Sequence, residues 1–329
     1  MPNNSITAIP GIKVGHAHDE AAATGCTVIV TEKGAVAGVD QRGGAPGTRE
    51  TDALRPAHLV SKVHAIMLAG GSAFGLDAAG GAMRYLEERK VGLNVGVARV
   101  PIVPSAILFD LGIGSAKRRP DAEMGYVACQ NASAEEPAQG NAGAGMGATV
   151  GKLLGMGQAV KAGIGNALLD AGGGVKVGAL IAVNAFGDVI GPDGEILAGV
   201  RSVRKGPVKI GKGQFADSLQ LLRTTAGRSV MGLAQGSNTV IGVVATNAEL
   251  DKEGATKVAA MASNGLARCL RPANTMLDGD TLFALSTGRK KADVNIVGAF
   301  AAEAVVQAVY NALQAARQLA GVPSLQDLR

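Results

Sequence analysis

A hydroxyl and two carboxylates stand at the starts of two apolar segments, in a pattern that suits amide chemistry. Thr239 begins the apolar run 239–246 directly after a Gly-Ser-Asn turn, a place where backbone strain can be stored. Further along the chain, Asp278 and Asp280 precede a second apolar run, 281–285. If that segment is extended, the two carboxylates face the same side, and such close charges must share a proton or be neutralised by a cation. A turn followed by solvated acids is the alternative explanation.

Two histidines form a second candidate pair. His16 and His18 follow an apolar segment, so a strand there would present both imidazoles on one face, where they could ligate a metal ion. Asp52, His58 or His64 could supply the further ligands that a hydrolytic metal site needs. Solvent-facing or structurally hydrogen-bonded histidines are the ordinary explanation, and we expect neither a metal nor a cofactor.

Two glycine-rich segments approach known motifs without matching them. The run 143–147 is followed by Lys152, but Leu153 stands where a phosphate-binding loop needs Ser or Thr. The segment 70–75 contains Ser72 between a strand and a helix, yet its last glycine is one place late for a nucleophile elbow. Close backbone packing explains these glycines better, although Lys152 places a charge next to a buried segment.

The elements that must position these residues indicate a mixed α/β protein. Short apolar runs bounded by glycine predict strands over 26–30, 65–69, 178–184, 239–246 and 281–285. Three- and four-residue apolar spacing and the usual stop signals predict helices over 75–89, 216–223, 251–270 and 295–319. The basic, aperiodic stretch 201–212 is expected to be an exposed loop.

Composition excludes several classes of protein. The 329 residues are 47% hydrophobic, enough for a large core, and only 3% aromatic, which leaves few rings for binding single-stranded nucleic acid. The 32 basic and 27 acidic residues are interleaved, so a net charge of +5 predicts no nucleic-acid partner. Three scattered cysteines and the lack of a signal-peptide pattern favour a cytoplasmic protein. No uncharged apolar run is long enough to predict a membrane partner.

Six segments, in order along the chain, carry a family resemblance. They are Pro10–His16, Arg42–Thr48, Leu68–Leu76, Gly140–Thr149, Gly236–Ala248 and Met276–Ala284. Together they resemble the DmpA-type aminopeptidases, a family that includes β-peptidyl aminopeptidases and nylon-oligomer hydrolases. The fifth segment is similar to the self-cleavage junction of that family.

The resemblance implies a four-layer α/β/β/α sandwich, similar to N-terminal nucleophile hydrolases but differently connected. It also implies a precursor that its own nucleophile cuts, here between Asn238 and Thr239. The fragments 1–238 and 239–329 would then form one domain. Because the family forms tetramers of such fragment pairs, we expect a homo-oligomer. Helix 295–319 has small residues suited to close packing between or within protomers: Ala299, Ala301, Ala302, Ala308 and Ala312.

The resemblance also implies a set of site residues. Thr239 followed by Asp278 and Asp280 is similar to the nylon-oligomer branch, whereas aminopeptidase members commonly carry Ser with a Ser-x-Glu pair. Lys152 and Asn184 match the lysine and asparagine that complete the site in that branch.

The expected chemistry is attack by Thr239 Oγ1 on an amide carbonyl. The α-amine freed by self-cleavage would be the base, since an α-amino pKa near 7.7–8.0 suits that task. The two carboxylates would hold this amine, Lys152 would balance their charge, and Asn184 would donate to the oxyanion. Phe109 stands where some aminopeptidases carry a Tyr oxyanion donor, so that donor is missing.

Three alternatives remain open at this point. The threonyl ester could be resolved by an amine, which would make the protein an acyltransferase. A metal-dependent hydrolase at His16 and His18 and a non-catalytic binding protein are the others. The substrate also stays open among an α-peptide, a β-peptide, a D-residue amide and an ω-amino-acid oligomer.

Overall fold

The computed structural model describes residues 3–203, 210–225, 227–228 and 238–328. Its centre is a nine-stranded sheet that bends along β2 (Thr24–Gln41) into two stacked halves. The first part of β2 pairs with β1 (Lys13–Asp19) and β4 (Val63–Ala69), and its last part pairs with β18 (Thr281–Lys290). This long strand therefore belongs to both halves.

The strand order is β10-β11-β16-β18-β2-β4-β7-β3. Strand β1 pairs with the first part of β2, on the side opposite β4. The remaining strands of this sheet are β3 (Thr48–Arg49), β7 (Ser105–Ile107), β10 (Ile164–Asp170), β11 (Lys176–Asn184) and β16 (Thr239–Ala248). The smaller sheets consist of β5 (Leu93–Asn94), β6 (Arg99–Val100), β8 (Thr149–Val150), β9 (Val160–Lys161), β12 (Asp188–Ile190), β13 (Ile196–Ala198), β14 (Val200–Val203), β15 (Ile210–Ala216) and β17 (Leu270–Arg271).

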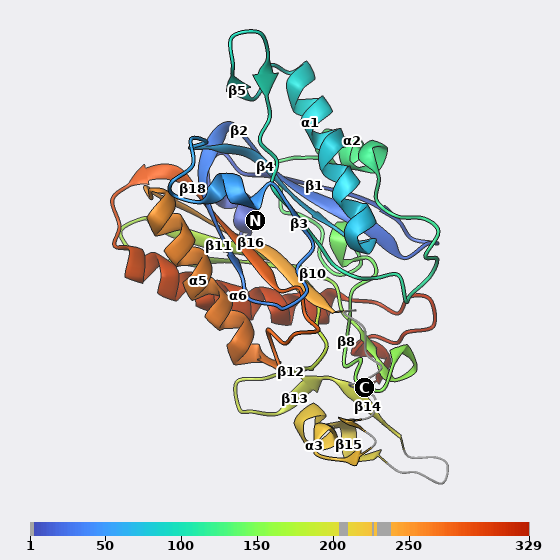
Figure 1. Ribbon diagram of the computed structural model, residues 1–329. Helices are drawn as coiled ribbons and strands as arrows, with labels where there is room; N and C mark the ends of the chain where they lie inside the picture. The colour runs from blue at the N-terminus through green and yellow to red at the C-terminus, as the bar shows by residue number, and fades with distance from the viewer. Residues whose placement is uncertain (1–2, 204–209, 226, 229–237, 329) are drawn as a thin grey trace.

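The described helices are α1 (Ala78–Glu88), α2 (Ala122–Gln130), α3 (Ser218–Leu222), α5 (Lys252–Cys269) and α6 (Val294–Ala315). The short 3-10 turns are η1 (Ile6–Ala8), η2 (Thr51–Leu54), η3 (Ser72–Asp77), η4 (Gly143–Gly145), η5 (Met156–Gln158) and η6 (Gln326–Leu328). Helices α5 and α6 cover one half of the sheet, and α1 and α2 cover the other (Figure 1).

Alternating side chains on the central strands build three apolar layers between four layers of secondary structure. In β16, Val240 faces α5 and α6, whereas Ile241 faces the other half of the sheet. In β4, Leu68 joins that middle layer and Met67 faces α1 and α2. Successive strand residues point to opposite faces, so strands buried on both faces are apolar throughout. The expected α/β/β/α sandwich is confirmed.

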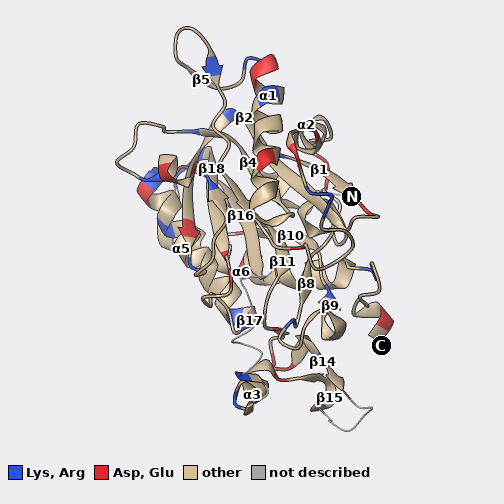
Figure 2. Cartoon of the chain, turned by 45° about the vertical axis from the view of Figure 1, so that its right-hand side comes forward, with Lys and Arg blue, Asp and Glu red and all other residues tan. Residues whose placement is uncertain are grey.

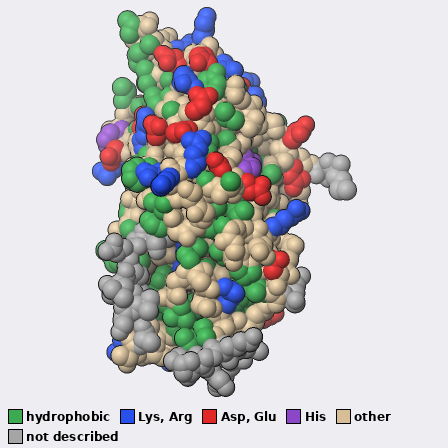
Figure 3. Space-filling model, turned by 90° about the vertical axis from the view of Figure 1, so that its right-hand side faces the viewer, with side chains coloured by type: hydrophobic (Ala, Val, Ile, Leu, Met, Phe, Trp, Pro, Cys, Tyr) green, Lys and Arg blue, Asp and Glu red, His purple; other side chains and the backbone are tan. Residues whose placement is uncertain are grey.

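Charged side chains lie mostly around the outside of this sandwich. Figure 2 shows few of them in the central strands, in keeping with the cost of burying an unpaired charge. On the face shown in Figure 3, Lys and Arg stand next to Asp and Glu, and neither sign dominates.

The predicted central strands are found where the sequence places them. The ranges 26–30, 65–69 and 178–184 lie within β2, β4 and β11. The strands expected over 239–246 and 281–285 are the first parts of β16 and β18. Helix α5 also starts as predicted, because the Asp251 side chain caps it by accepting from the Gly254 N–H at 2.7 Å.

Several boundaries differ from the sequence prediction. The stretch 201–212, expected to be a loop, forms strand at both of its ends, where Arg201 of β14 pairs with Phe215 of β15. Residues 204–209 lie outside the described residues. The helix expected from residue 75 begins as η3 and becomes α-helical only at Ala78. The short α3 occupies the middle of the range 216–223.

Helix α6 ends at Ala315 rather than at residue 319. The Asn141 side chain donates to Arg317 O at 2.9 Å and accepts from the Arg317 N–H at 3.2 Å, which draws the chain away from the helix axis. By length and composition α6 could span a membrane, but 56% of its most apolar window is buried inside the protein. A core helix passes the same test, and α6 contacts the sheet and α5.

Candidate active site

The site lies where three neighbouring strands of one sheet half end or begin. Strands β16 and β18 run parallel, so both start at the same edge, and β11 runs antiparallel to β16 and ends there. Thr239 is the first residue of β16, and its register partner is Asn184, the last residue of β11. Upstream of the β16–β18 ladder and in the same register, Asn238 forms an isolated parallel bridge with Asp278. Strand pairing thus brings the nucleophile candidate, the amide and the carboxylates together.

Thr239 and the peptide bond before it are buried. Thr239 is 3% exposed and Asn238 1%. The Thr239 hydroxyl donates to the carbonyl oxygen of Asn238, so it lies directly against the carbonyl that self-cleavage would attack. The Asn238 carboxamide is also buried, and neither of its polar atoms has a hydrogen-bond partner in the described structure.

The two carboxylates hold different parts of the site. Asp280 accepts from the Val240 N–H at 2.7 Å and from the Asn274 N–H at 3.0 Å, which ties the start of β16 to the loop before β18. Asp278 accepts from the backbone N–H of Thr275 at 2.9 Å and from its hydroxyl at 2.6 Å. Both aspartates are buried, so these are structural anchors as well as charges.

Lys152 brings a buried cation to this edge. Its Nζ donates to the Asn184 backbone oxygen at 3.0 Å and to Asn184 Oδ1 at 2.7 Å. Burial lowers the pKa of Lys152 to about 7, although the charges of Asp278, Asp110 and Asp280 act in the opposite direction.

Burial and the charge of Asp278 raise the pKa of Asp280 to about 7, against the opposing effect of its backbone hydrogen bonds and of Lys152. A proton can therefore be held by either Lys152 or Asp280 near neutral pH, which suits proton transfer to and from Thr239.

Asn184 is fixed by three neighbours. Besides Lys152, its Oδ1 accepts from the Thr149 N–H at 3.1 Å, and its Nδ2 donates to the backbone oxygen of Phe109 at 2.9 Å. An amide nitrogen carries two N–H groups, so one remains for a reacting oxygen. The Phe109 ring provides no such donor; its backbone oxygen orients the amide instead.

Sequence reasoning missed Asp110, which follows Phe109. Its carboxylate accepts from the Gly71 N–H at 2.6 Å and from the Thr24 hydroxyl at 2.8 Å, and burial raises its pKa. With Lys152 and Thr149 it lines a cavity of about 90 Å³. A charged residue directly after the apolar segment 105–109 was the available signal.

The histidine pair does not form a metal site with the other candidates. His16 Nδ1 hydrogen-bonds the Thr27 hydroxyl at 2.9 Å, and His18 Nδ1 accepts from the Gly143 N–H at 3.4 Å. His64 instead accepts from the Ile102 N–H at 3.2 Å. Across the described residues, no group of three His, Cys, Asp or Glu could hold a metal ion. The metal-dependent alternative gains no support.

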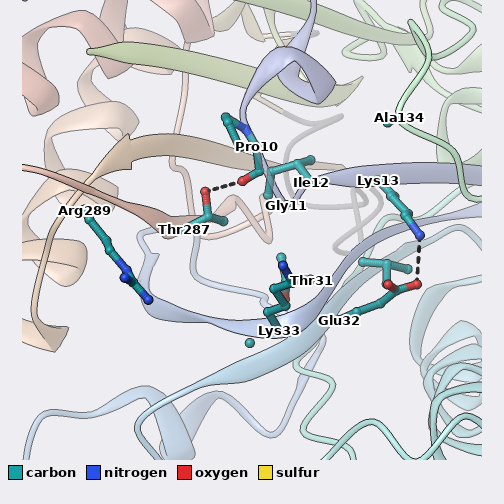
Figure 4. Close-up of a pocket in the computed structure, with 12 residues that line it drawn as sticks. Pro10, Gly11, Ile12, Lys13, Thr31, Glu32, Lys33, Ala134, Thr287 and Arg289 are labelled. Carbon is teal, nitrogen blue, oxygen red and sulfur yellow. Dashed lines mark hydrogen bonds and ion pairs between the residues drawn. The ribbon is translucent and has the colours of Figure 1, made fainter. Parts of the chain in front are cut away.

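A second pocket, of about 440 Å³, lies away from Thr239 (Figure 4). Its lining includes Thr287 and Arg289, near the end of β18, whereas Asp280 precedes the start of that strand. Thr287 closes one side by donating to Pro10 O at 2.8 Å, and Lys13 pairs with Glu32 at 2.9 Å.

Comparison with known proteins identifies similar sequences along almost the whole chain. The profile of peptidase family S58 matches residues 4–325. An uncharacterized aminopeptidase of Mycobacterium leprae is 42% identical, over 98% of this chain and 93% of the relative. A 6-aminohexanoate-oligomer endohydrolase of Kocuria sp. is 32% identical, over 92% of this chain and 84% of the relative.

Two solved structures share the fold. A Burkholderia sp. β-aminopeptidase superposes with a TM-score of 0.69 at 22% identity, covering 99% of this chain and 92% of that one. The L-aminopeptidase D-Ala-esterase/amidase of Ochrobactrum anthropi, described as a variant of the Ntn-hydrolase fold, also has a TM-score of 0.69. Its identity is 19%, with 96% of this chain and 87% of that chain covered.

Proposed function

The chain belongs to peptidase family S58 and is a hydrolase of peptide or amide bonds; we propose that Thr239 is its nucleophile and that the chain activates itself by cleavage between Asn238 and Thr239. One observation carries this proposal: the Thr239 hydroxyl lies against the Asn238 carbonyl, inside a cluster of Lys152 and two buried carboxylates. The fragments 1–238 and 239–329 would remain one domain, since β16 lies between β11 and β18.

Self-cleavage proceeds by two balanced steps. Thr239 Oγ1 bonds to the Asn238 carbonyl carbon as its proton leaves, the Asn238–Thr239 C–N bond breaks, and the Thr239 nitrogen gains a proton. Breakage of that bond frees the α-amine of Thr239, and water then hydrolyses the resulting ester, which gives a carboxylate at Asn238 and restores the Thr239 hydroxyl. Because that amine does not exist before the cut, Lys152 or Asp280 must accept the first proton. Afterwards the α-amine serves as base for each substrate.

The two stages reuse one set of groups. Asp280 fixes the start of β16 through the Val240 N–H, and its carboxylate would hold the new ammonium group. Lys152 offsets the carboxylate charge, and the remaining Asn184 N–H stabilises the oxyanion of the tetrahedral intermediate.

The substrate class is the finer part of the proposal. Thr239 with two aspartates favours amides that need little side-chain recognition, including ω-amino-acid oligomers, and the Kocuria relative carries the name of such an activity. The M. leprae relative is named an aminopeptidase, so small peptides with a free amine are the second candidate class. The aspartates that would hold the nucleophile could equally bind a substrate ammonium group.

Three substrates separate these possibilities: a short peptide with a free N-terminus, the same peptide acetylated, and a 6-aminohexanoate oligomer. Hydrolysis confined to free amines is expected of an aminopeptidase, and cleavage of blocked or internal amides of an endo-amidase. Added amine acceptors test acyl transfer, because a transferase would convert the acyl group to a new amide. Fully processed protein that cleaves none of these compounds would contradict the proposed hydrolase.

We also propose a homo-oligomer in a reducing, cytoplasmic setting; the three cysteines are buried and free. Of the small residues in α6, Ala301, Ala302, Ala308 and Ala312 are buried in the protomer, which leaves Ala299 exposed. These four alanines therefore pack within their own chain, and only the exposed face of α6, with Ala299, is left for contact between protomers. Light scattering should give a mass several times that of one chain, and a stable single protomer would contradict the oligomer.

A further inference from the structure

We propose that the backbone N–H of Gly279 is an oxyanion donor for self-cleavage, an assignment that rests on the proposed nucleophile Thr239. The N–H of Gly279 donates to the carbonyl oxygen of Asn238 at 3.0 Å. That oxygen is the atom on which negative charge develops when Thr239 attacks. The group therefore meets the geometric requirement for an oxyanion donor, 2.7–3.1 Å from the reacting oxygen.

This contact follows from the topology of the sheet. The parallel ladder between β16 and β18 begins at Ile241 and Thr281, and Asn238 and Asp278 form an isolated parallel bridge in the same register. The hydrogen bond from Gly279 to Asn238 O joins the two segments at that bridge. The sheet thus positions the scissile carbonyl with a bond of its ordinary kind, and no side chain is needed.

A loop on the far side fixes the direction of the Gly279 N–H. Asp278 O accepts from the Ala45 N–H at 2.9 Å, and Asp280 O accepts from the N–H groups of Arg42 and Gly43 at 3.1 and 3.3 Å. The peptide unit that carries the Gly279 N–H is therefore held directly through Asp278 O, and the unit after Asp280 is held by the same loop. A donor held in place before reaction needs no reorganisation when charge appears.

The residue must also be glycine. A Cβ at position 279 would lie 2.8 Å from Thr239 Oγ1 and 2.6 Å from Ala45 O. The first contact would displace the nucleophile, and the second would push the 42–45 loop away. A side chain here would therefore disturb both the attacking hydroxyl and the loop that holds the N–H.

During the reaction the Gly279 N–H stays in place, while the oxygen atom that accepts its hydrogen bond becomes negatively charged. Oγ1 bonds to the Asn238 carbonyl carbon, and the carbonyl π electrons move to its oxygen, which becomes the oxyanion that Gly279 N–H stabilises. When the oxyanion collapses, the C–N bond breaks and the nitrogen of Thr239 takes the proton that Oγ1 gave up. In the processed enzyme the carbonyl of a substrate would take the same position.

The decisive experiment removes one N–H without adding a Cβ. Glycolic acid incorporated at position 279 by nonsense suppression in cell-free translation replaces that N–H with an ester oxygen. The ester also weakens Asp278 O as the acceptor for Ala45, so the matched control is L-lactic acid at position 45, which removes that one bond and leaves Gly279 intact. Precursor and fragments are followed over time by intact mass.

The ester at position 279 is expected to slow self-cleavage by about a hundredfold or more, as for other lost oxyanion donors. The ester at position 45 should slow it by no more than about tenfold, the effect of one ordinary hydrogen bond. Limited proteolysis of both esters in a Thr239→Ala chain checks that they fold. Equal rates for the two folded esters would overturn the role of Gly279 and leave Thr239 as nucleophile. An unmodified chain that stays uncut would instead contradict the proposed function.

Discussion

The Thr239→Ala chain is expected to remain a single uncut polypeptide and to lose amide hydrolysis altogether. Alanine removes the hydroxyl that contacts the Asn238 carbonyl, and no α-amine is released to act as base. Loss of a nucleophile typically costs on the order of 10⁶-fold in kcat, so both self-cleavage and turnover should fall below detection. Intact-mass spectrometry and a hydrolysis assay on the same sample measure the two effects.

Thr239→Ser is the matched control, because it keeps the hydroxyl and removes only a methyl group. This variant should still produce two fragments, with the second beginning at residue 239. The melting temperature of the alanine variant should lie within a few degrees of that of the natural protein, since a small buried side chain contributes about 1 kcal/mol to the free energy of unfolding. An alanine chain cut at the same bond, or a fragment beginning at another residue, would show that Thr239 is not the nucleophile.

The separate parts of the site could be predicted from sequence because each is a local pattern. An apolar, β-branched run predicts β16, and two acids before another apolar run mark the start of β18. That these strands are parallel neighbours could not be predicted, because helix α5 separates them in the chain and their pairing is a long-range contact. The bridge from Asn238 to Asp278 exists only once that pairing is formed.

Contacts that depend on distant segments were beyond sequence reasoning. Lys152 and Asn184 were assigned through family resemblance, since nothing in their spacing joins them. In the structure Lys152 Nζ lies 2.7 Å from Asn184 Oδ1. Nothing in the sequence singles out Gly279, because the role proposed for it belongs to the backbone and not to a side chain. The end of α6 was misplaced for the same reason: the residue that stops the helix, Asn141, lies far away in the sequence.

Asp280→Asn is expected to reduce both self-cleavage and turnover by about a hundredfold or more, with a smaller effect on stability. Asp280 accepts two backbone N–H groups, from Val240 and Asn274, and an asparagine can accept only with one of its two terminal atoms. One N–H would face the amide nitrogen, which costs about 1–3 kcal/mol and shifts the start of β16. The charge proposed to hold the Thr239 ammonium would be lost as well.

Asp188→Asn is the matched control for this change. Asp188 is a buried carboxylate that also accepts backbone N–H groups, from Ser218 at 2.7 Å and from Val200 at 3.3 Å, and its described hydrogen bonds go to residues other than those of the proposed site. Its replacement should lower the melting temperature and leave the turnover of processed enzyme within a few-fold of normal. If both variants kept most of their activity, Asp280 would be a structural anchor only.

The pH dependence of stability distinguishes the effect of the Asp280 charge from the effect of the side chain's shape. Burial and Asp278 raise the pKa of Asp280 to about 7, above its unfolded value of about 3.9, so the folded chain binds an extra proton between those values. The stability this group contributes is therefore full below about pH 4 and is lost as the pH rises through about 7. Asparagine lacks this titration, so the melting temperature of Asp280→Asn should fall furthest below that of the natural chain near pH 4 and approach it near pH 8. A gap of constant size would mean that Asp280 is already ionised at pH 4. A carboxylate with so low a pKa is too weak a base to take the first proton from Thr239, and Lys152 would then have to accept it.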